Sequence, residues 1–203
     1  MLSPGQLDIN CQPYLNNLRN NEINAVTVSR ISPEKGLEWL AFLANKCKEM
    51  TLPVIFTLIG PYLDEKYYQN ISLKLVNAGV RLAGTKKGKD LCQSYLDSDV
   101  LVMPSPQEGF PLVSTEGLRH SRPVLAKAIP PHVEMFGLFS ENPGVLVTDK
   151  NNALACEQAM TFIQNLASSL QLRKRLYSIS SSGSLLFNPE RLADKFTETV
   201  LAI

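Results

Sequence analysis

Two glutamates separated by seven residues, Glu108 and Glu116, stand in the middle of this 203-residue chain. Glu108 is followed by Gly109 and Phe110 and then by Pro111, whose fixed φ suits the start of a helix. A carboxylate before a helix can accept hydrogen bonds from ligand hydroxyl groups, and a second one inside the helix can reach the same ligand from another side. The spacing therefore predicts a site for a hydroxyl-rich ligand. The alternative is that Glu108 only complements a helix dipole and that Glu116 is solvated on the helix surface.

The residues around this pair place it at the end of a strand. Val100–Met103 is an apolar run that predicts a buried strand, and Pro104–Pro106 ends it. The apolar residues from Leu112 onward suit a helix packed on a sheet, and Pro123–Ala126 predicts the next strand. Unpaired N–H groups and the positive end of the helix dipole would then face the carboxyl edge of the sheet, which favours a phosphate or a sugar oxygen.

Two basic residues follow the first predicted strand. Arg30 comes directly after it, and Lys35 lies five residues further on, at the opening of a predicted helix. An Arg fork and a Lys point charge beside helix N–H groups would suit a diphosphate. The alternative is a solvated Lys35 with Arg30 paired to Glu34. Gly36 favours the functional interpretation, because glycine costs about 1 kcal/mol relative to alanine inside a helix. Close approach of its backbone to a ligand or a neighbouring strand would explain it.

The composition excludes several classes of protein. Hydrophobic residues make up 44% and charged residues 19%, as in a soluble globular protein, and the net charge of +1 provides no cationic excess for nucleic acid or anionic membrane. Four scattered cysteines predict free thiols in a reducing compartment. No apolar run approaches the roughly 18 residues of a membrane span, and no signal peptide is recognisable. We expect a cytoplasmic protein that binds no nucleic acid, and peripheral membrane association through a partner is compatible with this sequence.

Short apolar strands alternate with helical segments along the chain. The predicted strands are 25–28, 54–59, 80–82, 100–103, 123–126 and 145–147. One predicted helix begins at 32 or 33, one begins at 112, and a short one ends near 135. The other predicted helices are 64–77, 89–96, 153–168, 170–180 and 190–202. The segment 178–184 resembles a flexible connection between helices. This alternation predicts an α/β fold with a doubly wound parallel sheet of about six strands. Residues 1–24 are expected to form a connector and residues 25–203 one domain.

In such sheets, ligands bind beyond the carboxyl ends of the strands. The predicted loops there are Arg30 with Lys35, Gly60-Pro61, Gly84-Thr85-Lys86, Glu108 to Leu112, and Lys127 to His132. One edge thus gathers basic residues, loop glycines and two glutamates, which predicts a site for a phosphorylated, hydroxyl-rich ligand. The two histidines, His120 and His132, lack partners at metal-ligand spacing, so we expect them to be solvated or hydrogen-bonded.

These segments, in this order, resemble the C-terminal, donor-binding domain of a retaining GT-B glycosyltransferase of the group 1 family, which includes many mannosyl- and glucosyltransferases. The segment Glu108–Glu116 is similar to the donor-sugar motif, and Val28–Arg30 with Pro33–Gly36 looks like the basic pair on the donor diphosphate. Ile59–Pro61 resembles the second glycine turn, and Val80–Gly84 the strand before the nucleotide base. The resemblance covers nearly the whole chain and implies a Rossmann-like domain, one half of a GT-B fold.

The resemblance implies a role for each site residue. Arg30 and Lys35 would neutralise the leaving diphosphate and Glu108 would touch the sugar hydroxyls, as the catalytic residues, while Glu116 would touch the ribose. The implied donor-binding residues are Arg30, Lys35, Gly60, Gly84, Thr85, Glu108, Gly109, Phe110, Pro111, Leu112, Val113 and Glu116. The N–H groups of Leu112 and Val113 would face the phosphates or the sugar. No metal and no cofactor is implied, since the nucleotide-diphosphate sugar is the donor substrate.

Three residues depart from the family pattern. Gly117 stands where alanine is usual, Arg122 where glycine usually precedes the Pro-Val strand, and Pro111 replaces a common glycine and removes one donor N–H.

The implied function is retaining transfer of a hexose from a nucleotide-diphosphate sugar to an acceptor hydroxyl. An N-terminal acceptor-binding domain or a separately encoded partner would complete the enzyme. Because this chain begins at the family's connector, we expect it to bind donor but to be inactive as an isolated domain. The alternatives are a non-catalytic nucleotide-sugar-binding or assembly module, and a sugar-nucleotide epimerase, which the paired glutamates disfavour.

Overall fold

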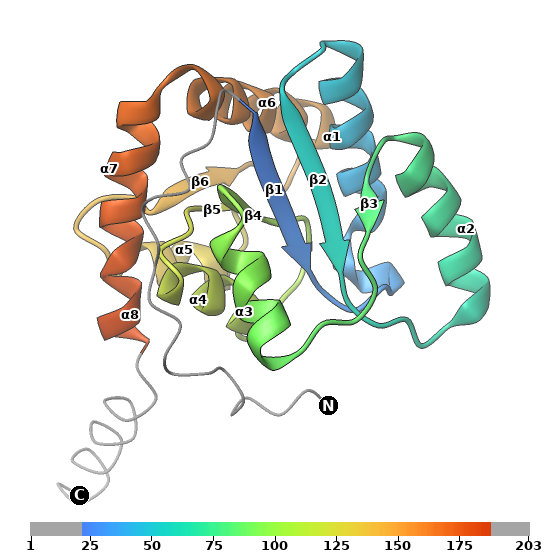
Figure 1. Cartoon of the computed structure of the whole chain (residues 1–203), viewed down its shortest axis with the longest axis horizontal. Helices are drawn as coiled ribbons and strands as arrows, with labels where there is room; N and C mark the ends of the chain where they lie inside the picture. The colour runs from blue at the N-terminus through green and yellow to red at the C-terminus, as the bar shows by residue number, and fades with distance from the viewer. Residues whose placement is uncertain (1–21, 188–203) are drawn as a thin grey trace, which may run out of the picture.

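A computed structural model describes residues 22–187 of the chain. Its sheet has six strands in the order β3-β2-β1-β4-β5-β6, and every neighbouring pair is parallel (Figure 1). The strands are β1 Ile23–Val28, β2 Val54–Ile59, β3 Arg81–Leu82, β4 Val100–Met103, β5 Val124–Lys127 and β6 Gly144–Val147. This confirms the predicted α/β fold. β1 begins inside the segment predicted as a connector, whose residues 1–21 lie outside the described part.

Helices follow the strands in turn. They are the 3-10 helix η2 Pro33–Lys35, α1 Leu37–Glu49, α2 Glu65–Asn77, α3 Gly88–Leu96, α4 Leu112–Arg119, α5 Pro130–Phe136, α6 Asn152–Ser168, α7 Leu170–Ser181 and α8 Gly183–Leu186. The flexible connection predicted at 178–184 is wrong. Ser180 is buried and its hydroxyl donates to the Pro143 carbonyl at 3.3 Å, while Gly183 packs closely on Leu118. The helix predicted at 190–202 lies outside the described residues.

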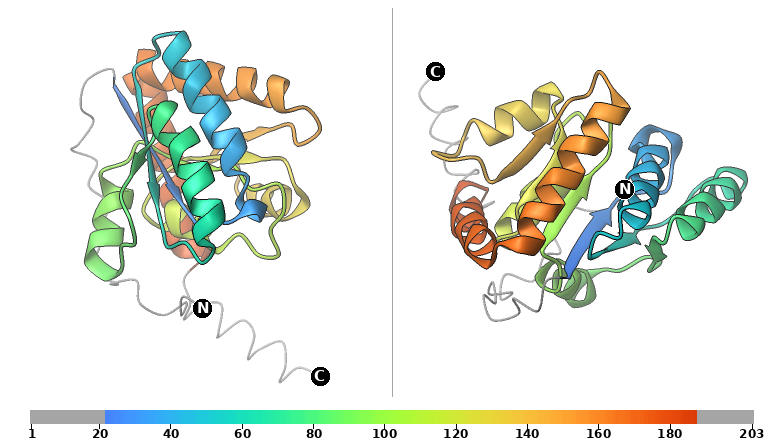
Figure 2. Two further views of the ribbon diagram at one scale, coloured as in Figure 1. Left: turned by 90° about the vertical axis from the view of Figure 1, so that its right-hand side faces the viewer. Right: turned by 90° about the horizontal axis from the view of Figure 1, so that it is seen from above.

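Alternate side chains of each strand point to opposite faces of the sheet, and each face has its own core. Val100 and Val102 of β4 pack in a cluster with residues of α1, α2 and α6. Leu101 and Met103 pack in a second cluster with residues of α3, α4 and α5. Figure 2 shows α1, α2 and α6 on one side of the sheet and α3 on the other. Burial on both faces explains why the strands are nearly continuous hydrophobic runs.

Two departures from the family pattern have local structural causes. A Cβ on Gly117 would lie 2.6 Å from Cδ2 of Leu101, so this leucine occupies the space of an alanine methyl. The left-handed residue before β5 is Ser121, with φ 61°, and not Arg122. Arg122 therefore does not need the conformation that favours glycine. Arg122 is buried, with its guanidinium 4.7 Å from the Tyr177 ring centroid.

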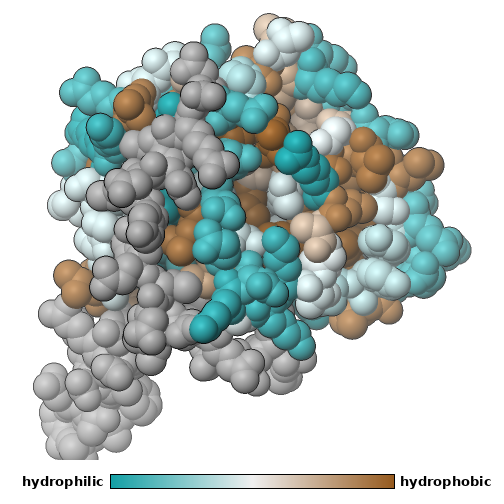
Figure 3. Space-filling model, in the orientation of Figure 1, coloured by the Kyte–Doolittle hydropathy of each residue, from teal (hydrophilic) through white to brown (hydrophobic). Residues whose placement is uncertain are grey.

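Exposed hydrophobic side chains are scattered among polar ones. Leu73 and Val76 are examples on α2, where hydrophobic and hydrophilic residues alternate in Figure 3. No helix within residues 22–187 is long and apolar enough to cross a bilayer. Among the cysteines, Cys47 and Cys156 are free and buried, but Cys92 is disulfide-bonded. The prediction of four free thiols is therefore wrong, because spacing along the chain does not reveal which sulfurs the fold brings together.

Candidate functional site

The strand order makes the junction of β1 and β4 the switch point of the sheet. The chain leaves β1 through α1 towards β2 on one side, whereas it leaves β4 through α4 towards β5 on the other. The two connections diverge at this point of the sheet, which is where open α/β sheets bind ligands. The loop 29–36 after β1 and the loop 104–111 after β4 lie at this switch point. These loops contain both predicted basic residues and the first predicted glutamate.

The two loops are in direct contact. Gly36 has φ +66°, and a Cβ there would lie 2.3 Å from the Pro104 carbonyl oxygen. The Ser105 hydroxyl lies 3.3 Å from the Glu34 carbonyl oxygen, to which it donates. The sequence predicts a close approach of Gly36 to a ligand or a neighbouring strand, and the structure shows its close approach to the loop that follows β4. The predicted helix start is wrong, because this left-handed glycine separates the 3-10 turn Pro33–Lys35 from α1.

An ion pair joins the two loops. The ammonium group of Lys35 lies 2.8 Å from Oε1 of Glu108, and the two side chains are only 17% and 12% exposed. Lys35 is therefore not a solvated lysine, since the close packing of Gly36 on Pro104 brings it to the opposite loop. A lysine and a carboxylate held together at low exposure could each bind a different part of one ligand.

Arg30 lies at the open edge of the same site. Its guanidinium contacts Oε1 of Glu34 at 3.3 Å, and both side chains are 51% exposed. The Ser32 hydroxyl donates to the same carboxylate oxygen at 2.7 Å. This hydrogen bond, more than the nearby Arg30 and Lys35 charges, lowers the pKa of Glu34. The pairing of Arg30 with Glu34 is thus present, and because exposed pairs of this kind are weak, it leaves Arg30 available to an anion.

Pro111 shapes the entry to α4. It occupies the N-cap position with φ −81° and ψ 63°, and the Leu112 N–H donates to the Phe110 carbonyl at 2.8 Å. These angles are those of an inverse γ-turn. The Leu112 N–H would have to leave this bond to meet a ligand, a constraint that the sequence analysis did not foresee. Phe110 is 62% exposed beside it.

Glu116 lies one turn further along α4. The hydroxyl of the buried Tyr95 donates to its Oε2 at 2.9 Å. Burial raises the pKa of Glu116, against the opposing effects of the Tyr95 hydrogen bond and the Arg119 charge. Glu116 is therefore not solvated on the helix surface. A carboxyl group whose pKa is shifted by burial is a candidate for a functional site.

We expect Glu116→Gln to raise the thermal unfolding midpoint at pH 7. Because the pKa of Glu116 is raised in the folded state, the cost of burying its charge is present above that pKa and disappears as the pH falls below the unfolded-state value. The gain should therefore shrink between pH 7 and pH 4. Glu157→Gln, at an exposed position of α6, should show no such gain. A Glu116→Gln chain less stable than the parent at pH 7 would contradict this explanation.

A family model described as "Glycosyl transferases group 1" matches residues 15–179. The chain belongs to this glycosyltransferase family. It is 33% identical over 101 residues to the sulfoquinovosyl transferase SQD2 of Arabidopsis thaliana, an alignment that covers 50% of this chain and 18% of that protein. It is 27% identical over 164 residues to an uncharacterised glycosyltransferase of Methanocaldococcus jannaschii, covering 81% of this chain and 44% of that protein. The chain thus spans less than half the length of both relatives.

Solved glycosyltransferase structures share the fold. Anabaena HepE, determined with UDP and glucose, has a TM-score of 0.75 at 20% identity, covering 90% of this chain and 49% of that one. The pneumococcal O-GlcNAc transferase GtfA, determined with UDP and GlcNAc, has a TM-score of 0.70 at 19% identity, covering 90% of this chain and 36% of that one. These likenesses confirm the predicted Rossmann-like half of a GT-B fold.

In this glycosyltransferase chain, the loops after β2 and β3 are joined to each other. The Gly60 N–H donates to the Gly84 carbonyl at 2.9 Å. Gly60 has φ +152°, and a Cβ there would lie 1.8 Å from the Ser29 carbonyl oxygen, so glycine is required by packing alone. Gly84 and Thr85 are exposed, with open space around the position of a Cβ on Gly84. Of these three residues, the exposed two are the better placed for a ligand.

The sequence analysis missed a buried contact behind the site. Ser114 of α4 and His132 of α5 are both fully buried, with 3.2 Å between the hydroxyl oxygen and Nε2. Nδ1 of His132 lies 2.9 Å from the Lys127 carbonyl, to which it must donate, so Nε2 accepts the Ser114 proton. Burial also lowers the pKa of His132. This bond connects α4, which carries Glu116, to α5. The sequence around His132 predicts only a short helix and gives no sign of the contact.

Lys127 does not join the site, although the sequence analysis placed it on the loop at this edge. It lies within β5 and is buried, with its ammonium group 2.9 Å from the Asn152 side-chain oxygen and 4.3 Å from the Trp39 ring centroid. Alternation along the strand explains the direction, since its neighbour Ala126 packs in the core with α3 and α4. Within residues 22–187, no three His, Cys, Asp or Glu side chains are placed to hold a metal ion.

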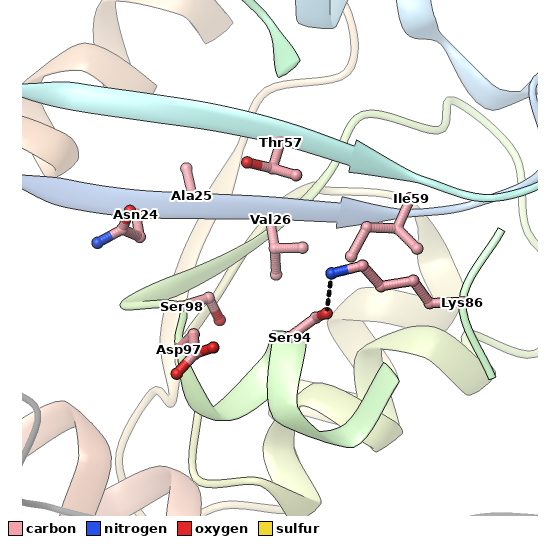
Figure 4. A pocket seen from close by; sticks show the side chains of 9 residues that line it. All are labelled: Asn24, Ala25, Val26, Thr57, Ile59, Lys86, Ser94, Asp97 and Ser98. Atoms are coloured by element: carbon pink, nitrogen blue, oxygen red, sulfur yellow. Dashed lines mark hydrogen bonds between the residues drawn. The ribbon is translucent and has the colours of Figure 1, made fainter. Parts of the chain in front are cut away.

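A pocket of about 140 Å³ lies between α3 and the face of β1 and β2, and it is not lined by Lys35 or Glu108 (Figure 4). Asn24, Val26 and Thr57 line the strand side, and Ser94 and Ser98 the opposite side. Lys86 closes one end, with its ammonium group 2.9 Å from the Ser94 hydroxyl. The pocket contains none of the predicted catalytic residues.

Proposed function

We propose that this chain binds a nucleotide-diphosphate sugar at the loops after β1 and β4 and forms the donor half of a retaining hexosyltransferase. The observation that carries the proposal is the Lys35–Glu108 ion pair of 2.8 Å, beside the N-terminus of α4. It brings together a cation for a diphosphate and a carboxylate for sugar hydroxyls. The helix N-terminus adds a positive dipole end on the same side.

Each residue would then have a defined part in the transfer. Lys35 and Arg30 neutralise the diphosphate, and Glu108 accepts a hydrogen bond from a hydroxyl of the sugar. The bond between the anomeric carbon and the diphosphate oxygen breaks through an oxocarbenium-like transition state, and its electron pair leaves with the diphosphate. The acceptor oxygen forms the new bond on the same face and passes its proton to the departing phosphate oxygen. Glu116 holds the ribose.

The solved relatives support this choice of donor, since HepE was determined with UDP and glucose and GtfA with UDP and GlcNAc. Because Lys35 and Arg30 supply positive charge, we propose that donor binding requires no divalent metal. Transfer also requires an acceptor hydroxyl within about 3–3.5 Å of the anomeric carbon. We propose that an N-terminal domain or a separately encoded partner positions that hydroxyl.

Saturation-transfer NMR with UDP-, GDP- and ADP-sugars in the presence of EDTA tests donor binding. We expect at least one donor to bind under these conditions, and a radiolabelled sugar to be transferred only when the acceptor-binding part is present. Binding that disappears with EDTA and returns with magnesium or manganese would contradict metal-independent charge neutralisation. Binding to no donor would exclude the proposed function.

A further inference from the structure

Tyr95 is the buried neighbour of Glu116. It lies in α3, its side chain is fully buried, and its hydroxyl is 2.9 Å from Oε2 of Glu116. Burial, and next the Glu116 charge, raises the pKa of Tyr95, so the hydroxyl stays a hydrogen-bond donor. It approaches the carboxylate from α3, whereas the proposed donor site lies at the loops after β1 and β4. The two helices are seen next to each other in Figure 1.

The ring of Tyr95 is fixed as well as its hydroxyl. It stacks on His120 with 4.9 Å between ring centroids and 19° between planes. Nδ1 of His120 lies 2.7 Å from the backbone carbonyl of Glu116, so the histidine connects the ring to the same turn of α4. The Tyr95 hydroxyl therefore contacts the Glu116 side chain, and the Tyr95 ring is connected through His120 to the Glu116 backbone.

The chain contains a second buried tyrosine–carboxylate pair for comparison. The Tyr177 hydroxyl donates to Oδ1 of Asp99 at 2.8 Å, and the Asn24 N–H donates to Oδ2 at 2.9 Å. Both oxygens of Asp99 are therefore used structurally, whereas in the described part of the chain Glu116 is hydrogen-bonded through Oε2 alone.

We infer that Tyr95 is a positioning residue, which holds Glu116 by Oε2 so that Oε1 can accept a hydrogen bond from a ribose hydroxyl. This inference rests on the proposed function, in which Glu116 binds the ribose of the donor. A glutamate with two free oxygens could rotate about its side-chain bonds and lose part of its interaction with the ligand. Tyr95 removes that freedom before the ligand binds.

Calorimetry on Tyr95→Phe tests the inference, because phenylalanine keeps the stacked ring and removes only the hydroxyl. The probes are UDP, GDP and ADP, each compared with its 2′,3′-dideoxy form. The parent chain should bind the ribose form of its preferred nucleotide roughly tenfold or more tightly than the dideoxy form, as expected for a hydrogen bond to a charged group. In Tyr95→Phe this ratio should fall to about threefold or less. Affinity for inorganic pyrophosphate should stay unchanged.

Tyr177→Phe is the matched control. It removes a hydroxyl from a more deeply buried tyrosine–carboxylate pair, so it should lower the unfolding midpoint at least as much but keep the parent's ribose ratio. In a Glu116→Ala background, Tyr95→Phe should have no further effect on the ratio, since the two residues act as one unit.

The outcomes separate the inference from the proposed function. If the parent prefers ribose and Tyr95→Phe keeps that preference, Tyr95 is purely structural and the inference is overturned while the proposed function stands. If the parent binds nucleotides without preferring ribose, the inference is also overturned. If none of the three nucleotides binds to the parent, the proposed function fails together with the inference.

Discussion

Replacing Gly36 by alanine is expected to destabilise the chain by about 2–5 kcal/mol, the sum of a left-handed residue and an overpacked contact. The added Cβ would lie 2.3 Å from the Pro104 carbonyl oxygen and 3.1 Å from Cδ of Pro106, at a backbone φ of +66°. The obstacle is backbone and a proline ring, neither of which can rotate away. The two loops must therefore separate, and Lys35 must move away from Glu108. Chemical denaturation measures the loss, and nucleotide affinity should fall with it.

Gly79→Ala separates the two causes. Gly79 has φ +89°, but no atom lies within 4 Å of its Cβ position. This variant should therefore cost only the conformational term, about 1–2 kcal/mol, and leave nucleotide binding unchanged. Equal losses for both glycines would show that the contact between the loops does not matter for stability.

Lys35→Ala is expected to lower the affinity for a nucleoside diphosphate by about ten- to a hundredfold, since hydrogen bonds to charged groups contribute about 1.5–3 kcal/mol each. Two effects act together. The variant removes the cation, and it leaves Glu108, whose side chain is 12% exposed, as an unpaired negative charge beside the phosphates. The exposed Arg30 should contribute less. Affinity for the bare nucleoside should change little in both variants.

Lys46→Ala serves as the control for this measurement. Lys46 also forms an ion pair, 2.7 Å from Glu49, but on the exposed surface of α1. Its removal should leave diphosphate binding unchanged. If Lys35→Ala weakens nucleoside binding as much as diphosphate binding, then Lys35 maintains the fold and does not bind phosphate. Adding Glu108→Gln to Lys35→Ala should restore part of the diphosphate affinity, because it removes the unpaired charge.

The sheet was predictable because its strands are short, buried on both faces and separated by helical segments. Every predicted strand overlaps an observed one, from β1 Ile23–Val28 to β6 Gly144–Val147. The errors occur where distant residues determine the local conformation. The break at Gly36 depends on Pro104, 68 positions further along the chain. Likewise, the serine-rich segment 178–184 is helical because it packs on residues of other elements.

The site was predictable only as a set of loops at one edge. Lys35 and Glu108 are 73 positions apart, and their pairing depends on β1 lying beside β4, which the order of strands along the chain does not reveal. No sequence pattern around Tyr95 indicates a role in the site. Its bond to Glu116 spans 21 positions and joins two helices. Neither contact has a local sequence pattern.

The most direct test of the proposed binding site is a titration of the ¹⁵N-labelled chain with UDP, monitored by amide NMR. The central claim is that the diphosphate binds between the loops after β1 and β4. We expect the largest chemical-shift changes at the amides of Lys35, Gly109 and Val113, and smaller changes at the α3 pocket. Shifts concentrated at Asn24, Ser94 and the rest of that pocket, with the amides of the two loops unchanged, would contradict it.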